Sequence, residues 1–244
     1  MGTAIVVTSG KGGTGKTSIT GGVAGSLARL GHSVLCIDMD IGLRNLDISL
    51  GLSDRALMDF SDVAEGRCPL VRAAVNHPDL PGLALLTAPM TLSPALTEEA
   101  VRRMLDTARS LYDYVLIDSP AGLGAGFRMA CCGADRAIVV STNDASSLRD
   151  AQRTVGELDF LRQIHLVMNR IQPKLLRQLR TTIDDAMDTA GLPLLGVVPE
   201  DPQVMLCANR GEPLILAASR GAAVAYLNIA KRLLGQRSPL MKLK

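Results

Sequence analysis

The sequence predicts an α/β protein with a doubly wound, mostly parallel sheet of about seven or eight strands and helices on both faces. Two observations support this fold class. Short apolar runs alternate with longer helical stretches along nearly the whole chain, and polar or acidic residues follow several of the apolar runs directly. Strands that are covered on both faces are apolar throughout, whereas strands with one solvated face alternate. Because no linker or shift in composition interrupts the pattern, we expect a single domain over residues 1–236 and a short tail over residues 237–244.

The first apolar run, Ala4–Thr8, predicts a buried strand that leads through a glycine-rich turn into a helix over Thr17–Arg29. The turn fits the GxxxxGK[ST] pattern of a phosphate-binding loop, in the strand–turn–helix context that such a loop needs. Glycines allow consecutive backbone N–H groups to face an anion, and the N-terminus of the helix adds partial positive charge. We therefore predict binding of ATP or ADP by Gly10, Lys11, Gly12, Gly13, Thr14, Gly15, Lys16, Thr17 and Ser18.

The loop pattern assigns a chemical role to two of its side chains. Lys16 would place its charge at the β- and γ-phosphates, and the Thr17 hydroxyl would be a ligand of Mg²⁺. Lys11 is a second lysine at the start of the loop, where a long flexible side chain cannot easily fold back onto the phosphates that Lys16 already holds. Lys11 could cross a dimer interface to a partner's nucleotide, as an arginine finger does. The alternative is a solvated loop lysine.

The second strand, Ser33–Ile37, ends in the carboxylates Asp38 and Asp40. Side chains two residues apart point the same way if the backbone stays extended. One carboxylate would then lie near the metal, and the other would orient the attacking water. The alternative is that both cap the following turn.

The remaining elements continue the alternation. We expect further strands at Leu83–Thr87, Tyr114–Ile117, Ala137–Ser141, Ile164–Met168 and Leu194–Val198, and helices at Thr97–Ser110, Leu123–Cys131, Ser147–Leu161, Lys174–Ala190 and Arg220–Leu234. Parallel sheets bind ligands outside the carboxyl ends of their strands. Asp118 comes directly after the apolar run Tyr114–Ile117, so it is predicted to hold Mg²⁺ through a water molecule.

The motifs resemble those of the deviant-Walker-A ATPases, the ParA/MinD family, whose loop reads KGGxGKT. The run Asp40–Asp47 resembles the switch I region of the division-site branch, and Asp118–Gly122 resembles switch II. Ser146–Asp150, Val198–Asp201 and Asn209–Pro213 extend the resemblance over nearly the whole chain.

The resemblance implies an Mg²⁺-dependent ATPase in which Lys11 reaches the nucleotide of a second subunit of an ATP-dependent homodimer. It also implies that Asp40 positions water, that Asp38 supports it near the metal, and that Asn169 pairs with adenine, with Arg170, Pro199 and Asp201 in the neighbouring loops. From the residues alone, Asn169 is equally well explained as a turn residue after a strand. The implied partners are a MinC-like division inhibitor, a MinE-like activator and an anionic membrane.

Two other functions within the family remain open: a regulator of flagellar number or placement, and a ParA-like DNA segregation ATPase. Leu43, Arg44 and Asn45 favour division-site placement. A formal net charge of only +2 and 2 % aromatic residues make a nucleic-acid partner unlikely. Three cations and several leucines within Lys174–Arg180 suggest a lipid- or DNA-contacting helix, but such a helix more often buries its leucines and solvates its cations.

The cellular location follows from cysteines and termini. Five cysteines without C-x-x-C spacing predict reduced thiols in the cytoplasm, and no signal segment precedes the first strand. Only Leu240–Lys244 follow Pro239, and five residues are too few for an amphipathic anchor. We expect peripheral attachment of the ATP-bound protein to the cell membrane only if an amphipathic helix is present at the C-terminus.

Overall fold

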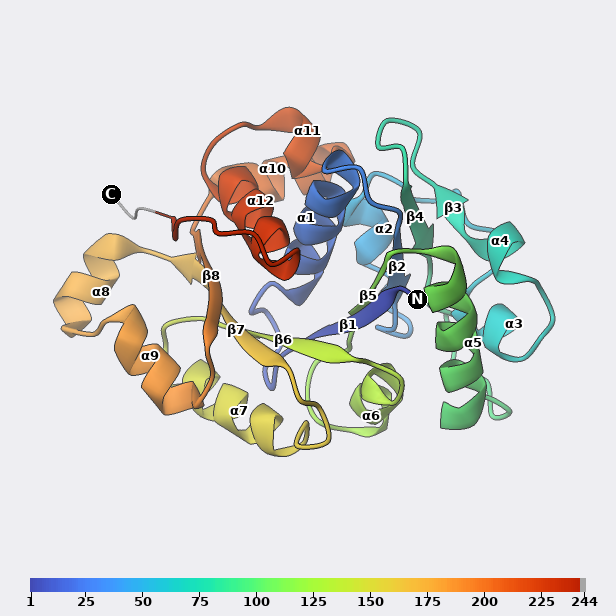
Figure 1. The fold of residues 1–244 in the computed structure, drawn as a ribbon, viewed down its shortest axis with the longest axis horizontal. Coiled ribbons are helices and arrows are strands. Elements are labelled where there is room, and N and C mark those ends of the chain that lie inside the picture. The colour runs from blue at the N-terminus through green and yellow to red at the C-terminus, as the bar shows by residue number, and fades with distance from the viewer. Residues whose placement is uncertain (242–244) are drawn as a thin grey trace.

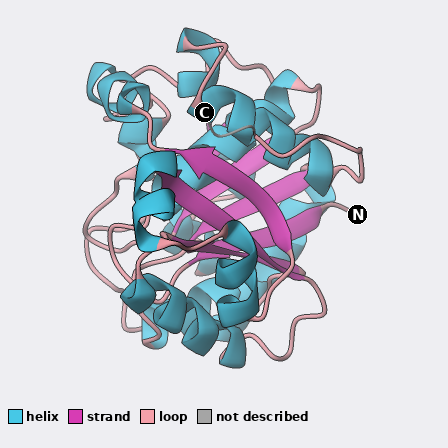
Figure 2. Cartoon of the chain, turned by 90° about the vertical axis from the view of Figure 1, so that its left-hand side faces the viewer, coloured by secondary structure: helices cyan, strands magenta, loops and turns pink. Residues whose placement is uncertain are grey.

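The computed structural model describes residues 1–241 and contains an eight-stranded sheet with helices on both faces (Figures 1 and 2). The strands are β1 (Thr3–Thr8), β2 (Val34–Asp38), β3 (Val75–Asn76), β4 (Leu83–Leu86), β5 (Tyr114–Asp118), β6 (Arg136–Ser141), β7 (Ile164–Ile171) and β8 (Leu194–Pro199). The helices are α1 (Lys16–Arg29), α2 (Leu46–Ser49), α3 (Phe60–Ala64), α4 (Leu70–Ala73), α5 (Glu98–Leu111), α6 (Ala125–Cys131), α7 (Ala145–Gly156), α8 (Pro173–Leu179), α9 (Ile183–Ala190), α10 (Pro202–Arg210), α11 (Leu214–Ala217) and α12 (Ala222–Leu233).

The strand order is β3-β4-β2-β5-β1-β6-β7-β8, and every pair is parallel except β3 with β4. The predicted fold class is therefore confirmed, with all seven predicted strands present. The sequence did not reveal β3, because two partly exposed residues carry no apolar run. β1 lies at the centre, so the loop that follows it opens between the ends of β5 and β6.

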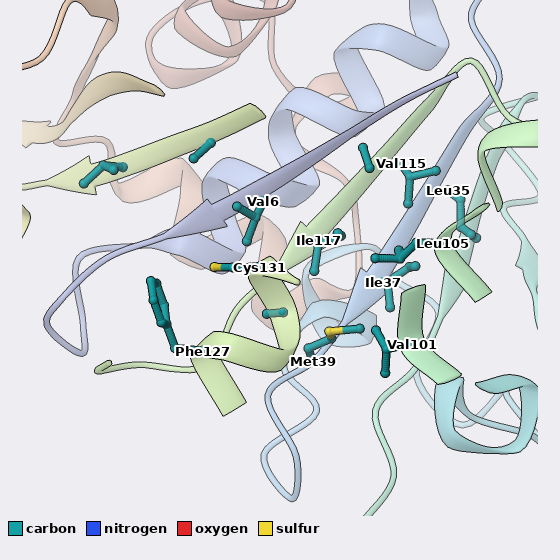
Figure 3. Close-up of a cluster of buried hydrophobic side chains, with 14 of the residues drawn as sticks. Val6, Leu35, Ile37, Met39, Val101, Leu105, Val115, Ile117, Phe127 and Cys131 are labelled. Atoms are coloured by element: carbon teal, nitrogen blue, oxygen red, sulfur yellow. The ribbon is translucent and has the colours of Figure 1, made fainter. Parts of the chain in front are cut away.

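Two hydrophobic layers pack against the sheet, because successive side chains of a strand point to opposite faces. From β1, Ile5 and Val7 join the layer beneath α1, α2, α10, α11 and α12, whereas Val6 joins the layer beneath α3 to α7 and α9. Figure 3 shows the second layer, where Ile117 of β5 lies between Val6 of β1 and Ile37 of β2. Burial of both faces fixes the register, and with it the order in which polar residues emerge at the strand ends.

The predicted helix over Lys174–Ala190 is wrong, since this segment forms two helices. Arg180 adopts a left-handed backbone with φ 51° and ends α8, and Thr182 then caps α9 in a capping box with Asp185. The Thr182 Oγ1 accepts from the Asp185 N–H at 3.1 Å, while the Asp185 carboxylate accepts from the Thr182 N–H at 2.7 Å. Five short helices, α2, α3, α4, α10 and α11, were not predicted either. Of the predicted tail, residues 242–244 lie outside the described residues.

Among residues 1–241, no helix combines the length and hydropathy that a bilayer span requires.

His77 provides a test of the packing between β3 and α2. Its Nδ1 accepts from the N–H groups of Asp79 and Leu80, at 3.0 and 3.1 Å, so its Nε2 is the atom that donates to the Leu50 carbonyl, at 3.0 Å. Burial lowers the pKa of this imidazole below its ordinary value. The folded protein therefore keeps His77 neutral at a pH where the unfolded chain, with a pKa of about 6.5, already binds a proton.

We expect the contribution of His77 to the free energy of unfolding to fall as pH decreases below about 6.5, because protons then favour the unfolded form of this side chain. Urea unfolding of the wild type and of His77→Gln between pH 7.5 and 5.5 measures this contribution, and the stability difference between the two proteins should change with pH. His165, with a lowered pKa, and Asp38 and Asp118, with raised pKa values, are retained in both proteins and cancel in the comparison. Equal slopes for the wild type and His77→Gln would contradict the assignment of a neutral His77.

Candidate nucleotide-binding site

The glycine-rich loop connects β1 to α1 at the centre of the sheet. Gly13 and Gly15 have φ of 79° and 93°, a left-handed backbone that residues with a Cβ rarely adopt. Gly15 is the N-cap of α1, and Lys16 is the first residue of the helix. The hydroxyl of Thr14 is buried without a hydrogen-bond partner in the described structure. A left-handed turn at a helix N-terminus orients backbone N–H groups toward an anion, as phosphate binding requires.

Lys16 brings a buried cation into this loop. Its side chain is 8 % exposed, and its ammonium donates to the Ser9 hydroxyl at 3.2 Å. Burial lowers the pKa of Lys16, and the charges of Asp118 and Asp40 oppose that shift. A desolvated ammonium with a single weak hydroxyl contact has donors left for a phosphate, so its position fits the predicted role.

Asp118 ends β5 directly beside the start of α1. Its Oδ2 accepts from the Thr17 hydroxyl at 2.6 Å, and its Oδ1 accepts from the Thr20 hydroxyl at 3.3 Å. Burial raises the pKa of Asp118 to about 7, against the hydrogen bond from Thr17, and the neighbouring Asp38 adds to the rise. Hydroxyl and carboxylate oxygens are the ligands that Mg²⁺ prefers, and a cation would relieve the repulsion between the two buried carboxylates. The residues present thus fit the predicted metal.

The extended backbone on which Asp38 and Asp40 would point the same way does not continue beyond Asp38. β2 ends at Asp38, and the chain turns immediately, with the Ile41 N–H donating to the Met39 carbonyl. The Asp38 carboxylate accepts from the N–H groups of Asp40 and Leu46, at 2.9 and 3.1 Å, and its pKa is raised by burial to about 6. Asp38 therefore caps the turn that follows β2.

Asp40 lies farther out than Asp38 and is half-buried. Burial raises its pKa, and the nearby Lys16 charge opposes the rise. The carboxylate thus stands within electrostatic reach of the buried ammonium of Lys16. That position suits a group that orients a water molecule.

Lys11 points away from its own loop. Its ammonium donates to the Ser146 hydroxyl at 2.9 Å and pairs with Asp144 at 3.3 Å, and both side chains are about half exposed. Asp144 is the N-cap of α7. Partial burial opposes the shift, but hydrogen bonds from the Ser146 and Thr142 hydroxyls, the Ser147 N–H and Lys11 hold the pKa of Asp144 well below its usual range. Sequence reasoning did not single out Asp144, although its place after β6 was a signal.

The residues that resemblance assigns to adenine meet at the neighbouring ends of β7 and β8. Asn169 is buried, and its Nδ2 donates to the Thr14 carbonyl at 2.7 Å, which leaves its Oδ1 for an amino group. Arg170 has φ 56°, and its Nε pairs at 2.8 Å with Glu200, the residue that follows Pro199. Asp201 instead uses both oxygens for helix caps, accepting from the Gln203 and Ala222 N–H groups at 3.0 and 2.9 Å.

A depression of about 340 Å³ lies at this edge of the sheet. It extends from Lys11 and Gly12 of the loop to Asp144 at the start of α7 and to Arg170 and Glu200. Concave sites of this size accommodate small ligands. Of the predicted residues, Lys11, Gly12, Gly13, Thr14 and Arg170 line this depression, whereas Lys16, Thr17, Asn169 and Pro199 do not.

Gly15 and Gly13 form a matched pair for testing the loop. A Cβ on Gly15 would lie 2.2 Å from the Asn169 Nδ2, whereas a Cβ on Gly13 would meet nothing within 4 Å. Both substitutions to alanine strain the backbone, but only Gly15→Ala also displaces the Asn169 amide from Thr14. We expect Gly15→Ala to lower the free energy of unfolding by about 1–3 kcal/mol more than Gly13→Ala. Urea unfolding of both variants measures the difference, and equal losses would contradict this geometry.

Comparison with known proteins agrees with the geometry. Residues 5–214 match the family model described as the CobQ/CobB/MinD/ParA nucleotide binding domain. The septum site-determining protein MinD of Bacillus subtilis is 41 % identical over all of this chain and 93 % of its own length. Among solved structures, the MinC:MinD cell division complex of Aquifex aeolicus is similar with a TM-score of 0.92 and 37 % identity, over 99 % of both chains.

MinD of Pyrococcus horikoshii, solved with Mg-ADP, is similar with a TM-score of 0.84 and 28 % identity over 96 % of both chains. A ParA family ATPase of Chlorobium tepidum, 21 % identical with a TM-score of 0.82 over 94 % of this chain and 99 % of its own, shares the fold. The loop, the strand-end carboxylates and these similarities lead to one conclusion: the chain belongs to the CobQ/CobB/MinD/ParA family of nucleotide-binding proteins, in its MinD branch.

Proposed function

We propose that this protein is an Mg²⁺-dependent ATPase switch for placing the bacterial division site. ATP binding would close a homodimer that recruits partners, and hydrolysis would return the protein to monomers. The observation that carries this proposal is the different placement of the two lysines of the loop. Lys16 is buried inside its own loop, whereas Lys11 is exposed and turned toward α7.

The loop would hold ATP through its backbone N–H groups, with Lys16 at the β- and γ-phosphates. Thr17, with Asp118 behind it and Asp38 close by, would hold Mg²⁺, which when bound neutralises charge on the phosphate oxygens. Asp40 would orient the water for attack, and Asn169, with Arg170 and Pro199 nearby, would receive adenine. Asp201 supports this region through the two helices that it caps.

Lys11 would act on the nucleotide of the second subunit. In the single chain its ammonium is held by Ser146 and Asp144, so dimerisation must exchange these contacts for phosphate oxygens. An exposed ion pair contributes only about 0–1 kcal/mol, so this exchange costs little. The charge then compensates the transition state from outside, as an arginine finger does.

The similar proteins suggest which proteins this chain would bind. The Aquifex aeolicus complex pairs MinD with MinC, and we infer a MinC-like division inhibitor as a partner of this chain. A MinE-like activator would stimulate hydrolysis. We also infer that the protein is cytoplasmic and binds the anionic membrane in its ATP-bound form if a C-terminal amphipathic helix is present. Residues 1–236 would act as one ATPase unit.

Light scattering and phosphate release, measured with ATP and with ADP, test the proposal. We expect ATP, but not ADP, to double the molar mass, and hydrolysis per subunit to rise with protein concentration. A monomer in ATP would contradict the switch. Co-sedimentation with DNA at two salt concentrations addresses the ParA-like alternative, which a salt-sensitive preference for DNA over anionic vesicles would favour.

A further inference from the structure

A second depression, lined by cations, lies at the amino ends of the strands, opposite the carboxyl ends where the glycine-rich loop lies. It has a volume of about 620 Å³, and its lining includes Arg136, Arg162, His165 and Arg232. Arg136 is the first residue of β6, His165 is the second residue of β7, and Arg232 lies in the last turn of α12. These residues come from parts of the chain nearly one hundred residues apart, and only the fold assembles them.

Among residues 1–241, no carboxylate lines this depression; its other lining residues are Tyr114, Gln163, Ile164, Pro193, Leu233, Leu234 and Gly235. The two acidic residues next to it in sequence are engaged elsewhere. Asp135 accepts from the Ala4 N–H at 2.8 Å and pairs with Arg109 at 2.9 Å, and Asp113 accepts from the Ser33 N–H at 2.8 Å. The cations therefore share a site without a local counter-charge.

The arginines differ in how much of their hydrogen-bonding capacity is used. Arg232 donates to the Leu195 carbonyl at 2.9 Å and, from Nε and Nη2, to the Ser238 carbonyl at 3.0 and 2.7 Å. It is thus held rigidly, with N–H groups remaining of the five that a guanidinium carries. Within residues 1–241, neither Arg136 nor Arg162 has a carboxylate within 4.0 Å.

His165 reports on the same surroundings. Burial lowers its pKa, and the positive charge of Arg136 lowers it further. The charged or titratable groups lining the depression around it are Arg136 from β6, Arg162 from the loop before β7, Arg232 from α12 and Tyr114 from β5. Like charges gathered without compensation create a positive potential that an anion would relieve.

We propose that this depression, defined by Arg136, Arg162, His165 and Arg232, binds a phosphate group, independently of the nucleotide site. Guanidinium groups match phosphate oxygens in a bidentate geometry, which favours phosphate over a spherical anion. The group could belong to a soluble phosphate compound or to a lipid headgroup. Its position at the far edge of the sheet would make it a second ligand site in the same subunit.

The test keeps the nucleotide site filled with Mg-ADP, because a phosphate-binding loop would otherwise take up the probe. Inorganic pyrophosphate is titrated while the imidazole signals of the three histidines are followed by NMR. We expect pyrophosphate to raise the pKa of His165, and to leave His32 and His77 unchanged. His165→Gln identifies the signal.

Arg162→Ala is the informative variant, since Arg162 is exposed and lies in the loop before β7. Loss of one charge-assisted contact should weaken pyrophosphate binding about tenfold or more. Arg72→Ala, which removes an exposed arginine from α4, should leave the affinity unchanged. Equal affinities for the wild type and Arg162→Ala, or no shift of His165, would overturn the proposal.

Vesicles distinguish the two sources of phosphate. In the presence of Mg-ADP, co-sedimentation with phosphatidylglycerol vesicles that exceeds that with phosphatidylcholine, and is lost in Arg162→Ala but not in Arg72→Ala, would assign the site to headgroups. A His165 response to pyrophosphate without such co-sedimentation would assign it to soluble phosphate compounds. A preference for duplex DNA over both probes would overturn the assignment.

Discussion

Lys11→Ala is expected to abolish ATP-driven dimerisation and to slow ATP turnover by about 10³-fold or more, the range that charge supplied in trans contributes. Affinity of the single subunit for Mg-ADP should change little. The reason is geometric: the Lys11 ammonium contacts Ser146 and Asp144, and is not part of its own phosphate cradle. Light scattering with ATP, calorimetry with Mg-ADP and a phosphate-release assay measure the three quantities.

Two control variants make the result specific to position. Lys174→Ala removes an exposed lysine from α8 and should behave as the wild type. Ser146→Ala removes the 2.9 Å partner of Lys11 without changing charge, and should also dimerise. If Ser146→Ala failed in the same way as Lys11→Ala, the lysine would be acting within its own subunit. ATP-dependent dimers of Lys11→Ala would remove the basis of the proposed switch.

Lys16→Ala should instead weaken nucleotide binding itself, raising the Kd for Mg-ADP by about 100-fold or more. Each charge-assisted hydrogen bond to phosphate contributes about 1.5–3 kcal/mol, and this ammonium would make more than one of them. Only 8 % of Lys16 is exposed, so no other cation of the loop can reach its position from the solvent. The loss of this one charge therefore has a large effect. Calorimetry with Mg-ADP measures the loss directly.

Lys16→Arg separates charge from shape. Arginine keeps the charge but carries a planar fork in place of a compact ammonium, and the buried space beside Ser9 is fitted to the smaller group. We expect it to bind nucleotide more weakly than the wild type. Circular dichroism of both variants monitors the fold. Mg-ADP affinity in Lys16→Ala within about threefold of the wild type would show that the phosphates lie elsewhere.

Much of the architecture followed from local chemistry. The uninterrupted apolar runs specified buried parallel strands, and the glycine–lysine spacing after Ala4–Thr8 specified a loop with a left-handed backbone at the start of a helix. Asp118 was expected at the carboxyl end of its strand because it follows an apolar run directly, and it ends β5 there. Such features depend on residues close together in the chain, so the sequence by itself determined them.

Other features depended on contacts between distant segments. The Asp118 carboxylate met the Thr17 hydroxyl, 101 residues away, and the Asp201 carboxylate was engaged by the Ala222 N–H, 21 residues away. The Asn169 amide was oriented by Thr14, 155 residues away. Hydrogen bonds of this kind form only after the sheet has brought the loops together, so tertiary structure alone decided which side chains were free for chemistry and which were already bound.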